Sequence, residues 1–237
     1  MRPVAIITGA SRGIGKSIAL ELAKYQYNFS LVARDRDNLR KIEDELSRKG
    51  AEVLSIPIDL ADETVAGHIV DQTIRHFGKI DVLINNAGIA LNKPILESDI
   101  SIWNKIFSIN VRTPYFLCQK SIPHIKKSQK PVIINMGSVV DHKGYINQSI
   151  YAASKHALAG FTSVLAKEVQ RDGIRVHLIS PGGVHTDMVT GVRPDLDTGE
   201  LIAPEEIANL VAFLCNYSGK GTIDQIKIRR FNSLPFD

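Results

Sequence analysis

Short apolar segments rich in β-branched residues alternate with longer segments of helical periodicity along the whole chain. The pattern predicts strands at residues 4–8, 29–33, 52–58, 82–84, 132–135, 175–179 and 223–228. It predicts helices at residues 14–25, 37–49, 63–77, 98–125 and 151–171, and another after Pro204. Strands that are apolar throughout are buried on both faces, which is typical of a parallel sheet between helical layers. The expected fold is therefore α/β, a doubly wound parallel sheet of about seven strands with helices on both faces.

The chain shows no linker, internal repeat or low-complexity stretch that would divide it. Its 237 residues would suit one large domain or two small ones at roughly 150 residues per domain. We expect residues 1–237 to form a single domain. No apolar run reaches the ~20 residues that a membrane helix needs, and no signal-peptide pattern precedes the first strand, so a cytoplasmic protein without membrane association is expected.

The distribution of charged residues, cysteines and histidines argues against a nucleic-acid, disulfide or metal site. The net charge is +4, but the basic residues are interleaved with acids, which favours a solvated surface over nucleic-acid binding. An anionic cofactor would suit the basic balance equally well. Cys118 and Cys215 lie in apolar helical segments far from any C-x-x-C spacing, and the seven histidines lie on separate elements. We therefore expect neither a disulfide scaffold nor a metal site, and a reducing compartment.

A glycine-rich loop separates the first predicted strand from the first helix. Residues 8–15 read Thr-Gly-Ala-Ser-Arg-Gly-Ile-Gly. Glycines there let backbone N–H groups approach a pyrophosphate, and the following helix directs its positive end at the same anion. The spacing G-x-x-x-G-x-G is one residue longer than the usual dinucleotide fingerprint. The loop therefore indicates a dinucleotide site, and a turn needed only for chain reversal is the alternative.

Together with later motifs, this loop resembles the signature of the short-chain dehydrogenase/reductase family. The matching residues are Gly9, Gly13 and Gly15, the run Asn85-Asn86-Ala87-Gly88, Asn110, Ser138, Tyr151-x-x-x-Lys155, and Pro181-Gly182 with Thr186. The resemblance covers nearly the whole chain. It implies a Rossmann-type fold and an NADP(H)-dependent oxidoreductase that transfers a hydride between the nicotinamide and a carbonyl or secondary alcohol. Carbonyl reductases and 3-oxoacyl-carrier-protein reductases are the members that it resembles.

The resemblance also implies which residues bind the cofactor. They are Gly9, Ser11, Arg12, Gly13, Ile14, Gly15, Arg34, Asp59, Leu60, Asn86, Ala87, Gly88, Tyr151, Lys155, Pro181, Gly182, Val184 and Thr186. Arg12 and Arg34 favour NADP over NAD, because guanidinium groups suit a 2′-phosphate. Asp35 leaves NAD open, since an acid at this point could instead turn toward the ribose. For Asp59 the alternative to an adenine contact is a helix N-cap.

Four residues form the expected catalytic set: Asn110, Ser138, Tyr151 and Lys155. Tyr151 and Lys155 are four residues apart, so both side chains project from one helix face. Tyr151 is expected to act as general acid/base, with the Lys155 ammonium lowering its pKa. Ser138 follows a strand and is expected to bind the substrate carbonyl. The resemblance gives Asn110 a water-held proton-relay role, and a structural polar bridge is the alternative.

The substrate side is less sharply defined. Val140, Tyr145 and Met188 suggest a pocket for an apolar or mixed ketone, whereas Asp141 and His142 favour a polar substrate. Residues 187–203 are predicted to form a mobile substrate loop. A small-molecule carbonyl compound is the expected substrate, with an acyl-carrier-linked one possible. A homodimer or homotetramer is expected, although the segment 221–230 departs from the family pattern.

Two alternatives come from other functional classes. A non-catalytic nucleotide-sensing or scaffold protein could keep the fold, but it would not need Tyr151. An epimerase or dehydratase of the family's longer branch would need a C-terminal substrate domain, for which too few residues follow Ala203.

Overall fold

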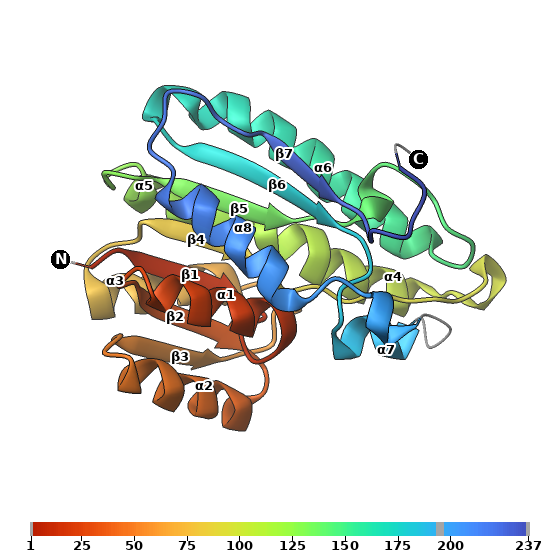
Figure 1. Ribbon diagram of the computed structural model, residues 1–237, viewed down its shortest axis with the longest axis horizontal. Helices are drawn as coiled ribbons and strands as arrows, with labels where there is room; N and C mark the ends of the chain where they lie inside the picture. The colour runs from red at the N-terminus through yellow and green to blue at the C-terminus, as the bar shows by residue number, and fades with distance from the viewer. Residues whose placement is uncertain (1, 193–196, 236–237) are drawn as a thin grey trace.

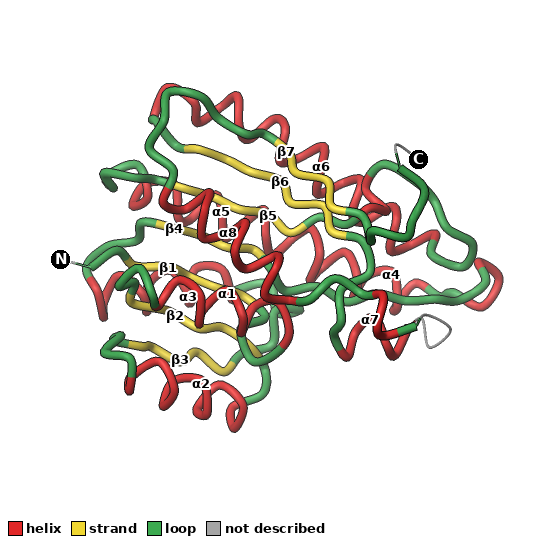
Figure 2. The backbone as a smooth tube through the Cα atoms, viewed as in Figure 1, coloured by secondary structure: helices red, strands yellow, loops and turns green. Residues whose placement is uncertain are grey.

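A parallel sheet of seven strands, in the order β3-β2-β1-β4-β5-β6-β7, forms the centre of the protein. The computed structural model describes residues 2–192 and 197–235. Figures 1 and 2 show the strands side by side, with helices in front of the sheet and behind it. The strands are β1 (Val4–Thr8), β2 (Asn28–Ala33), β3 (Val53–Pro57), β4 (Val82–Asn85), β5 (Val132–Met136), β6 (Arg175–Pro181) and β7 (Gln225–Ile228). The helices are α1 (Gly13–Ala23), α2 (Arg36–Arg48), α3 (Val65–Phe77), α4 (Ile100–Phe107), α5 (Thr113–Ile125), α6 (Ser149–Val169), α7 (Asp187–Val192) and α8 (Pro204–Asn216).

Two apolar cores hold the helices against the sheet. All five residues of β1 are buried, and successive strand side chains point to opposite faces. Ala5 and Ile7 belong to the core that includes α1, α2 and α8, whereas Ile6 belongs to the core that includes α3, α5 and α6. The predicted doubly wound sheet with helices on both faces is confirmed.

The structure differs from the prediction in two helical regions. The single helix expected at 98–125 is α4, a π-helical turn at Ser108–Arg112, and α5. The expected mobile loop at 187–203 begins instead with the short helix α7, in whose first turn Asp187 lies at the end where a carboxylate is favourable. A 3₁₀ turn follows at Thr198–Glu200. Pro194 and Asp195, on which the loop prediction partly rested, lie outside the described residues.

The strand order predicts at which edge of the sheet a ligand binds. Chain order reverses between the neighbours β1 and β4, and open α/β sheets bind ligands in the crevice beyond the carboxyl ends of the strands at such a point. In Figure 1 these ends lie at the right, next to α7 and the C-terminal tail. Among the helices of the described ranges, none has the combined length and apolar character needed to cross a bilayer.

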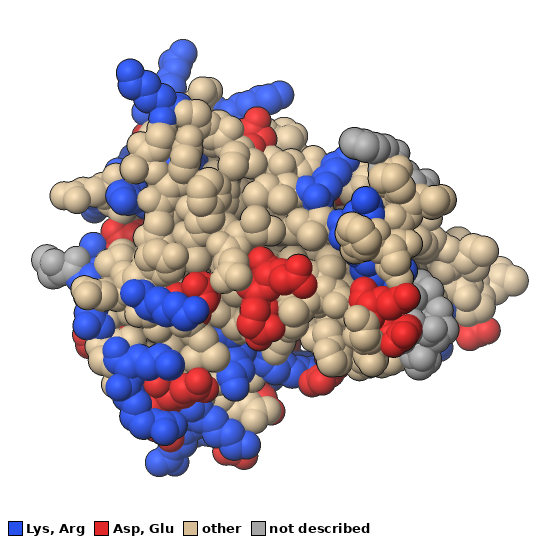
Figure 3. Space-filling view, in the orientation of Figure 1, with Lys and Arg blue, Asp and Glu red and all other residues tan. Residues whose placement is uncertain are grey.

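The exposed face of α2 carries both acidic and basic side chains. Over α2, at the lower left of Figure 3, Lys and Arg side chains lie among Asp and Glu side chains. The apolar residues of the same helix, Leu39, Ile42 and Leu46, are buried. The helix is thus an amphipathic surface element.

Candidate active site

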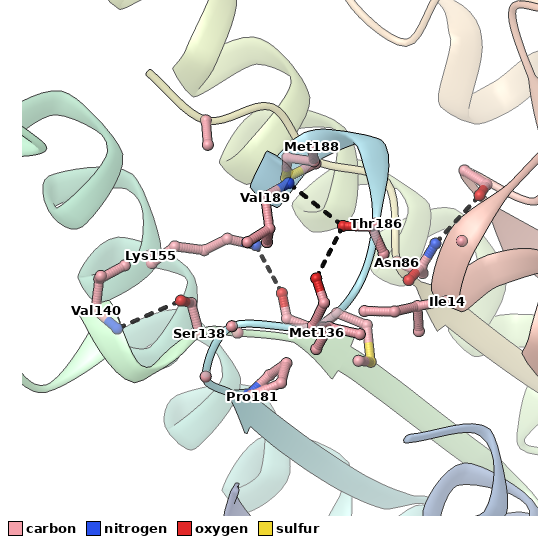
Figure 4. A pocket seen from close by; sticks show the side chains of 18 of the residues that line it. Ile14, Asn86, Met136, Ser138, Val140, Lys155, Pro181, Thr186, Met188 and Val189 are labelled. Carbon is pink, nitrogen blue, oxygen red and sulfur yellow. Dashed lines mark hydrogen bonds between the residues drawn. The ribbon is translucent and has the colours of Figure 1, made fainter. Parts of the chain in front are cut away.

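A cleft of about 1200 Å³ lies at the carboxyl ends of the strands. Every residue predicted to bind the cofactor lines it except Gly15, as do Ser138 and the three residues predicted for the substrate, Val140, Tyr145 and Met188. Asn110 does not line it. The segments after β1 to β7 all contribute, so the sheet brings together residues from Gly9 to Pro235. Figure 4 shows part of this cleft from close by.

The glycines of the first loop are required by its backbone. Gly9 and Gly13 have φ values of +66° and +53°, in the left-handed region that other residues rarely adopt. Gly15 lies behind the cleft, where a Cβ atom would come within 2.3 Å of the Gly9 carbonyl oxygen. Gly15 therefore permits the close approach of α1 to the loop instead of touching a ligand.

The N-terminus of α1 is left without a side-chain cap. Arg12 occupies the cap position and makes no capping hydrogen bond, and the first turn carries no acid. By contrast, the Asp35 carboxylate caps α2 by accepting from the Asn38 backbone N–H at 3.0 Å. The unpaired N–H groups and the positive end of α1 fit the pyrophosphate of a dinucleotide.

A set of hydrogen bonds fastens the segment after β4 to the end of β1. The Thr8 hydroxyl accepts from the backbone N–H groups of Asn86 and Ala87, each at 3.0 Å. The Asn86 side chain donates to the Thr8 carbonyl at 2.9 Å and to the Gly9 carbonyl at 3.3 Å, and Figure 4 marks the second of these bonds. These bonds set the floor of the cleft between its two halves.

The side of the cleft next to α1 and β2 carries the two arginines on which the cofactor prediction rests. Arg34 is exposed and lines the cleft just after β2. Asp35 also lines the cleft, and both of its carboxylate oxygens accept hydrogen bonds from Asn38. Arg12 forms an ion pair with Asp187 at 2.7 Å. Asp59 is not a helix cap, because α3 begins at Val65 and the Asp59 carboxylate accepts from the Ala61 N–H.

Ser138 and Tyr151 meet at the end of β5. Ser138 begins the 3₁₀ turn Val139–Asp141, where its hydroxyl accepts from the Val140 N–H at 3.4 Å. Tyr151 lies near the start of α6 and lines the same cleft as Ser138. Burial raises the pKa of Tyr151, hydrogen bonding to Ser138 opposes this shift, and the negative charge of Asp141 raises the pKa further. The prediction of a lowered tyrosine pKa is wrong, because burial outweighs any effect of the lysine.

Lys155 lies one helical turn beyond Tyr151 and points into the same site. Its Nζ donates to the Met136 carbonyl oxygen at 2.7 Å (Figure 4). The ammonium lies 5.9 Å from the centre of the Tyr151 ring. Burial lowers the pKa of Lys155 to about 8, and the charge of Asp141 opposes this shift. The lysine therefore carries its charge near neutral pH despite being buried.

Asn110 forms the structural bridge that the sequence left as an alternative. It lies in the π-helical turn, a feature common at functional sites. Its Oδ1 accepts from the Ile89 N–H, and its Nδ2 donates to the Ile89 carbonyl and to the Ser154 hydroxyl, at 2.9 to 3.0 Å. The side chain thereby fixes the segment after Gly88 against α6.

The segment after β6 forms the wall opposite Lys155. Pro181 ends the strand, and a Cβ atom on Gly182 would lie 3.3 Å from the Ile228 carbonyl oxygen. Val184 pairs with Ile202 in an isolated bridge. The Thr186 hydroxyl donates to the Val184 carbonyl and accepts from the Val189 N–H (Figure 4). These bonds shape the loop that leads into α7.

Comparison with known proteins identifies the family. The family model described as short chain dehydrogenase matches residues 3–197. The chain belongs to the short-chain dehydrogenases. It is 35% identical over 219 residues to carbonyl reductase family member 4 of Xenopus tropicalis, covering 90% of this chain and 91% of that protein.

Two further relatives extend the comparison. The 3-oxoacyl-[acyl-carrier-protein] reductase FabG of Staphylococcus epidermidis is 32% identical over 229 residues, or 93% of this chain and 94% of that one. An alcohol dehydrogenase of Thermococcus sibiricus, solved with 5-hydroxy-NADP, superposes with a TM-score of 0.91 at 26% identity and covers 99% of both chains. These similarities identify the protein as an enzyme of an oxidoreductase family that uses a nicotinamide cofactor.

Asp141 has a different place from the one its sequence position suggests. The sequence takes it, with His142, as favouring a polar substrate, but its side chain is fully buried and does not line the cleft. Its carboxylate accepts from the Ser138 N–H and the Ser180 hydroxyl. The pattern Ser-x-x-Asp at 138–141 is a capping-box signal that could have indicated the first of these bonds.

The lowered pKa of the buried Lys155 predicts that the free energy of unfolding rises as the pH becomes alkaline. A base whose folded pKa is about 8, against an ordinary value of 10.5, binds fewer protons folded than unfolded between these values, so stability rises with pH there. Relative to Lys155→Met, the wild-type free energy of unfolding should rise by roughly 3 kcal/mol from below pH 8 to above pH 10.5. Urea unfolding of both proteins measures this difference, because shared titrations cancel. A pH-independent difference would contradict the prediction.

Proposed function

We propose that the protein is an NADP(H)-dependent carbonyl reductase in which Tyr151 donates the proton. The observation that carries the proposal is that Ser138, Tyr151 and Lys155 line the same cleft, with the Lys155 ammonium 5.9 Å from the centre of the Tyr151 ring. The elevated pKa of Tyr151 supports reduction as the working direction, because a neutral phenol is the proton donor.

The chain's own residues supply binding, orientation and the proton. When bound, the nicotinamide supplies or accepts the hydride. The N-terminus of α1 and the glycines before it hold the pyrophosphate, and the segment from Pro181 to Thr186 supports the nicotinamide. The Ser138 hydroxyl donates a hydrogen bond to the substrate carbonyl oxygen, and Tyr151 transfers its hydroxyl proton to the same oxygen. Lys155 compensates the negative charge left on the tyrosine, and Asn110 keeps the surrounding segments in place.

Direct assay tests this function. Purified protein is mixed with NADPH and a panel of ketones and aldehydes, and nicotinamide absorbance is followed. Carbonyl-dependent oxidation of NADPH is expected. NADPH binding without turnover of any carbonyl compound would favour the alternative of a nucleotide-sensing protein.

The preference for NADP rests on Arg34. Its guanidinium lies beside the cleft after β2, and the neighbouring Asp35 is held as a helix cap. The related alcohol dehydrogenase was solved with an NADP derivative. Arg34→Asp should weaken NADPH binding by about 10- to 100-fold, the effect of losing a hydrogen bond to a charged group, and leave NADH binding nearly unchanged. Thermal-shift titration with both nucleotides measures this.

A control variant at a neighbouring arginine shows whether NADPH binding depends on Arg34 itself or only on the net charge of this surface. Arg36→Asp makes the same charge change at the first residue of α2, and Arg36 does not line the cleft. It should change NADPH binding by less than about threefold, as expected of a screened exposed charge. Equal stabilisation of the wild type by NADPH and NADH would refute the role of Arg34.

An oligomer and a cytoplasmic location complete the proposal. Trp103 on α4 and Tyr115 and Phe116 on α5 are exposed large aromatic residues, and exposed apolar patches are typical of protein interfaces. A homodimer or homotetramer that covers them is expected by light scattering.

A further inference from the structure

A buried carboxylate stands directly behind the proposed catalytic residues. Asp141 accepts from the Ser138 N–H at 3.2 Å and from the Ser180 hydroxyl at 2.5 Å, and its Oδ1 lies 2.7 Å from His142 Nδ1. A buried charge is tolerated only with such partners. Gly137 accommodates it, since a Cβ atom there would lie 2.3 Å from Asp141 Oδ2.

This carboxylate fixes the orientation of the neighbouring imidazole. Because a carboxylate only accepts, His142 Nδ1 must carry the hydrogen of their bond. The other ring nitrogen, Nε2, has no hydrogen-bond partner within the described part of the chain. The side chain is 26% exposed and His142 lines the cleft. Nε2 is therefore the edge of the ring that a ligand can reach, and it accepts a hydrogen bond in the neutral ring and donates one in the imidazolium.

The same network continues across the sheet. The Ser180 hydroxyl that donates to Asp141 also accepts from Gln225 Nε2 at 3.2 Å. Ser180 is on β6 and Gln225 on β7, so one chain of hydrogen bonds joins the turn after β5 to the edge strand. The position of His142 is thus set by a rigid part of the sheet, a requirement for a selective contact.

Positive charge gathers on the half of the cleft that adjoins β7 and the segment after it. Lys227 on β7 and Arg229 just beyond it line the cleft, are exposed, and have no ion-pair partner among the described residues. Arg229 donates to backbone carbonyls of Arg230, Phe231 and Ser233, which leaves its charge uncompensated. Of the described residues that line this half, only Asp187 is acidic, and Arg12 pairs with it.

These charges are separate from the proposed phosphate site. The α1 N-terminus follows β1, whereas Lys227 lies on β7, with β4, β5 and β6 between the two strands. A cofactor held at α1 therefore leaves the positive charge at β7 for another ligand. Lys227 and Arg229 line the same cleft as Ser138 and Tyr151, so they attract an anion that enters it.

We propose that His142, paired with the Asp141 carboxylate as an imidazolium, is a specificity-determining residue that donates from Nε2 to an anionic group on the substrate, either a carboxylate or a phosphate near the reacting carbonyl. Asp141 is the positioning residue, and Lys227 and Arg229 add long-range attraction. The inference rests on the proposed carbonyl reduction and narrows its substrate to anionic ketones.

Matched substrate pairs test the inference. NADPH-dependent reduction is measured for acetoacetate against methyl acetoacetate, and for dihydroxyacetone phosphate against dihydroxyacetone, so that the two pairs distinguish carboxylate from phosphate. The wild type should prefer the anion of at least one pair by about tenfold or more in kcat/KM, as expected for a hydrogen bond between charged groups. His142→Gln should raise KM for that anion by about tenfold with kcat within about twofold, and leave the neutral partner unchanged. His68→Gln, on the exposed side of α3, should match the wild type.

The outcomes separate this inference from the proposed function. Reduction of neutral ketones with no anion preference, or the same preference in His142→Gln, overturns the anion site and leaves the carbonyl reductase intact. If no ketone is reduced, the proposed function fails, and calorimetric titration with acetoacetate and dihydroxyacetone phosphate decides the anion site. Binding weaker in His142→Gln than in the wild type supports the site, and absent or equal binding overturns it.

Discussion

Tyr151→Phe is expected to lower kcat for carbonyl reduction by about 10²- to 10⁴-fold, the usual contribution of a positioned proton donor. The variant keeps the ring and its packing and removes only the hydroxyl, which lines the cleft with Ser138. The dissociation constant for NADPH should therefore stay within about twofold, because the phosphate cradle at α1 is unchanged. Steady-state kinetics and thermal-shift titration of the same preparation measure both quantities.

A second tyrosine provides the control for Tyr151. Tyr25 is 48% exposed beyond α1 and does not line the cleft, so Tyr25→Phe should retain full activity. Full activity of Tyr151→Phe would remove this residue from the proton transfer. Loss of NADPH affinity in parallel with kcat would instead assign its hydroxyl to cofactor binding.

Gly15→Ala is expected to impair both folding stability and cofactor binding. A Cβ atom at this position would lie 2.3 Å from the Gly9 carbonyl oxygen and 2.6 Å from Asn86 Nδ2. The first contact is with backbone, so α1 must move relative to the glycine loop. Overpacking of this kind costs about 1–3 kcal/mol, and the displaced helix N-terminus no longer faces the phosphates. Denaturant unfolding and NADPH titration are the measurements.

Gly67→Ala is the matched change in another helix. Gly67 lies inside α3, and a Cβ atom there would meet nothing within 4 Å. Alanine is the better helix former by about 1 kcal/mol, so this variant should be as stable as the wild type or more stable, with normal NADPH binding. Equal behaviour of the two alanine variants would contradict the steric argument for Gly15.

The architecture was predictable because its signals are local. β1 is apolar throughout, the glycine loop follows it directly, and α1 begins at Gly13. Tyr151 and Lys155 share one helix face by their spacing alone. The predicted residues from Gly9 to Thr186 consequently line one cleft, with Gly15 and Asn110 behind it.

Properties that depend on distant packing were not predictable. The pKa of Tyr151 is set mainly by burial, which no four-residue spacing reveals. Arg12 pairs with Asp187, a residue 175 positions away. The capping pattern at Ser138 indicates that Asp141 can bind a backbone N–H, but its link to Ser180 depends on how β5 and β6 are placed. Long-range electrostatics and burial arise from the fold as a whole.

With the proposed cofactor site at its uncapped start, α1 would couple the lifetime of this protein to its cofactor. Nucleotide phosphates that satisfy those N–H groups bind the native chain and not the unfolded one, which adds about 2.7 kcal/mol of stability at a ligand concentration of 100 times Kd. A cell that drains its nicotinamide pool would then hold a less durable form of the enzyme, with more of it open to proteases at any moment. Metabolic supply would thus govern how much of the protein persists as well as how fast it works.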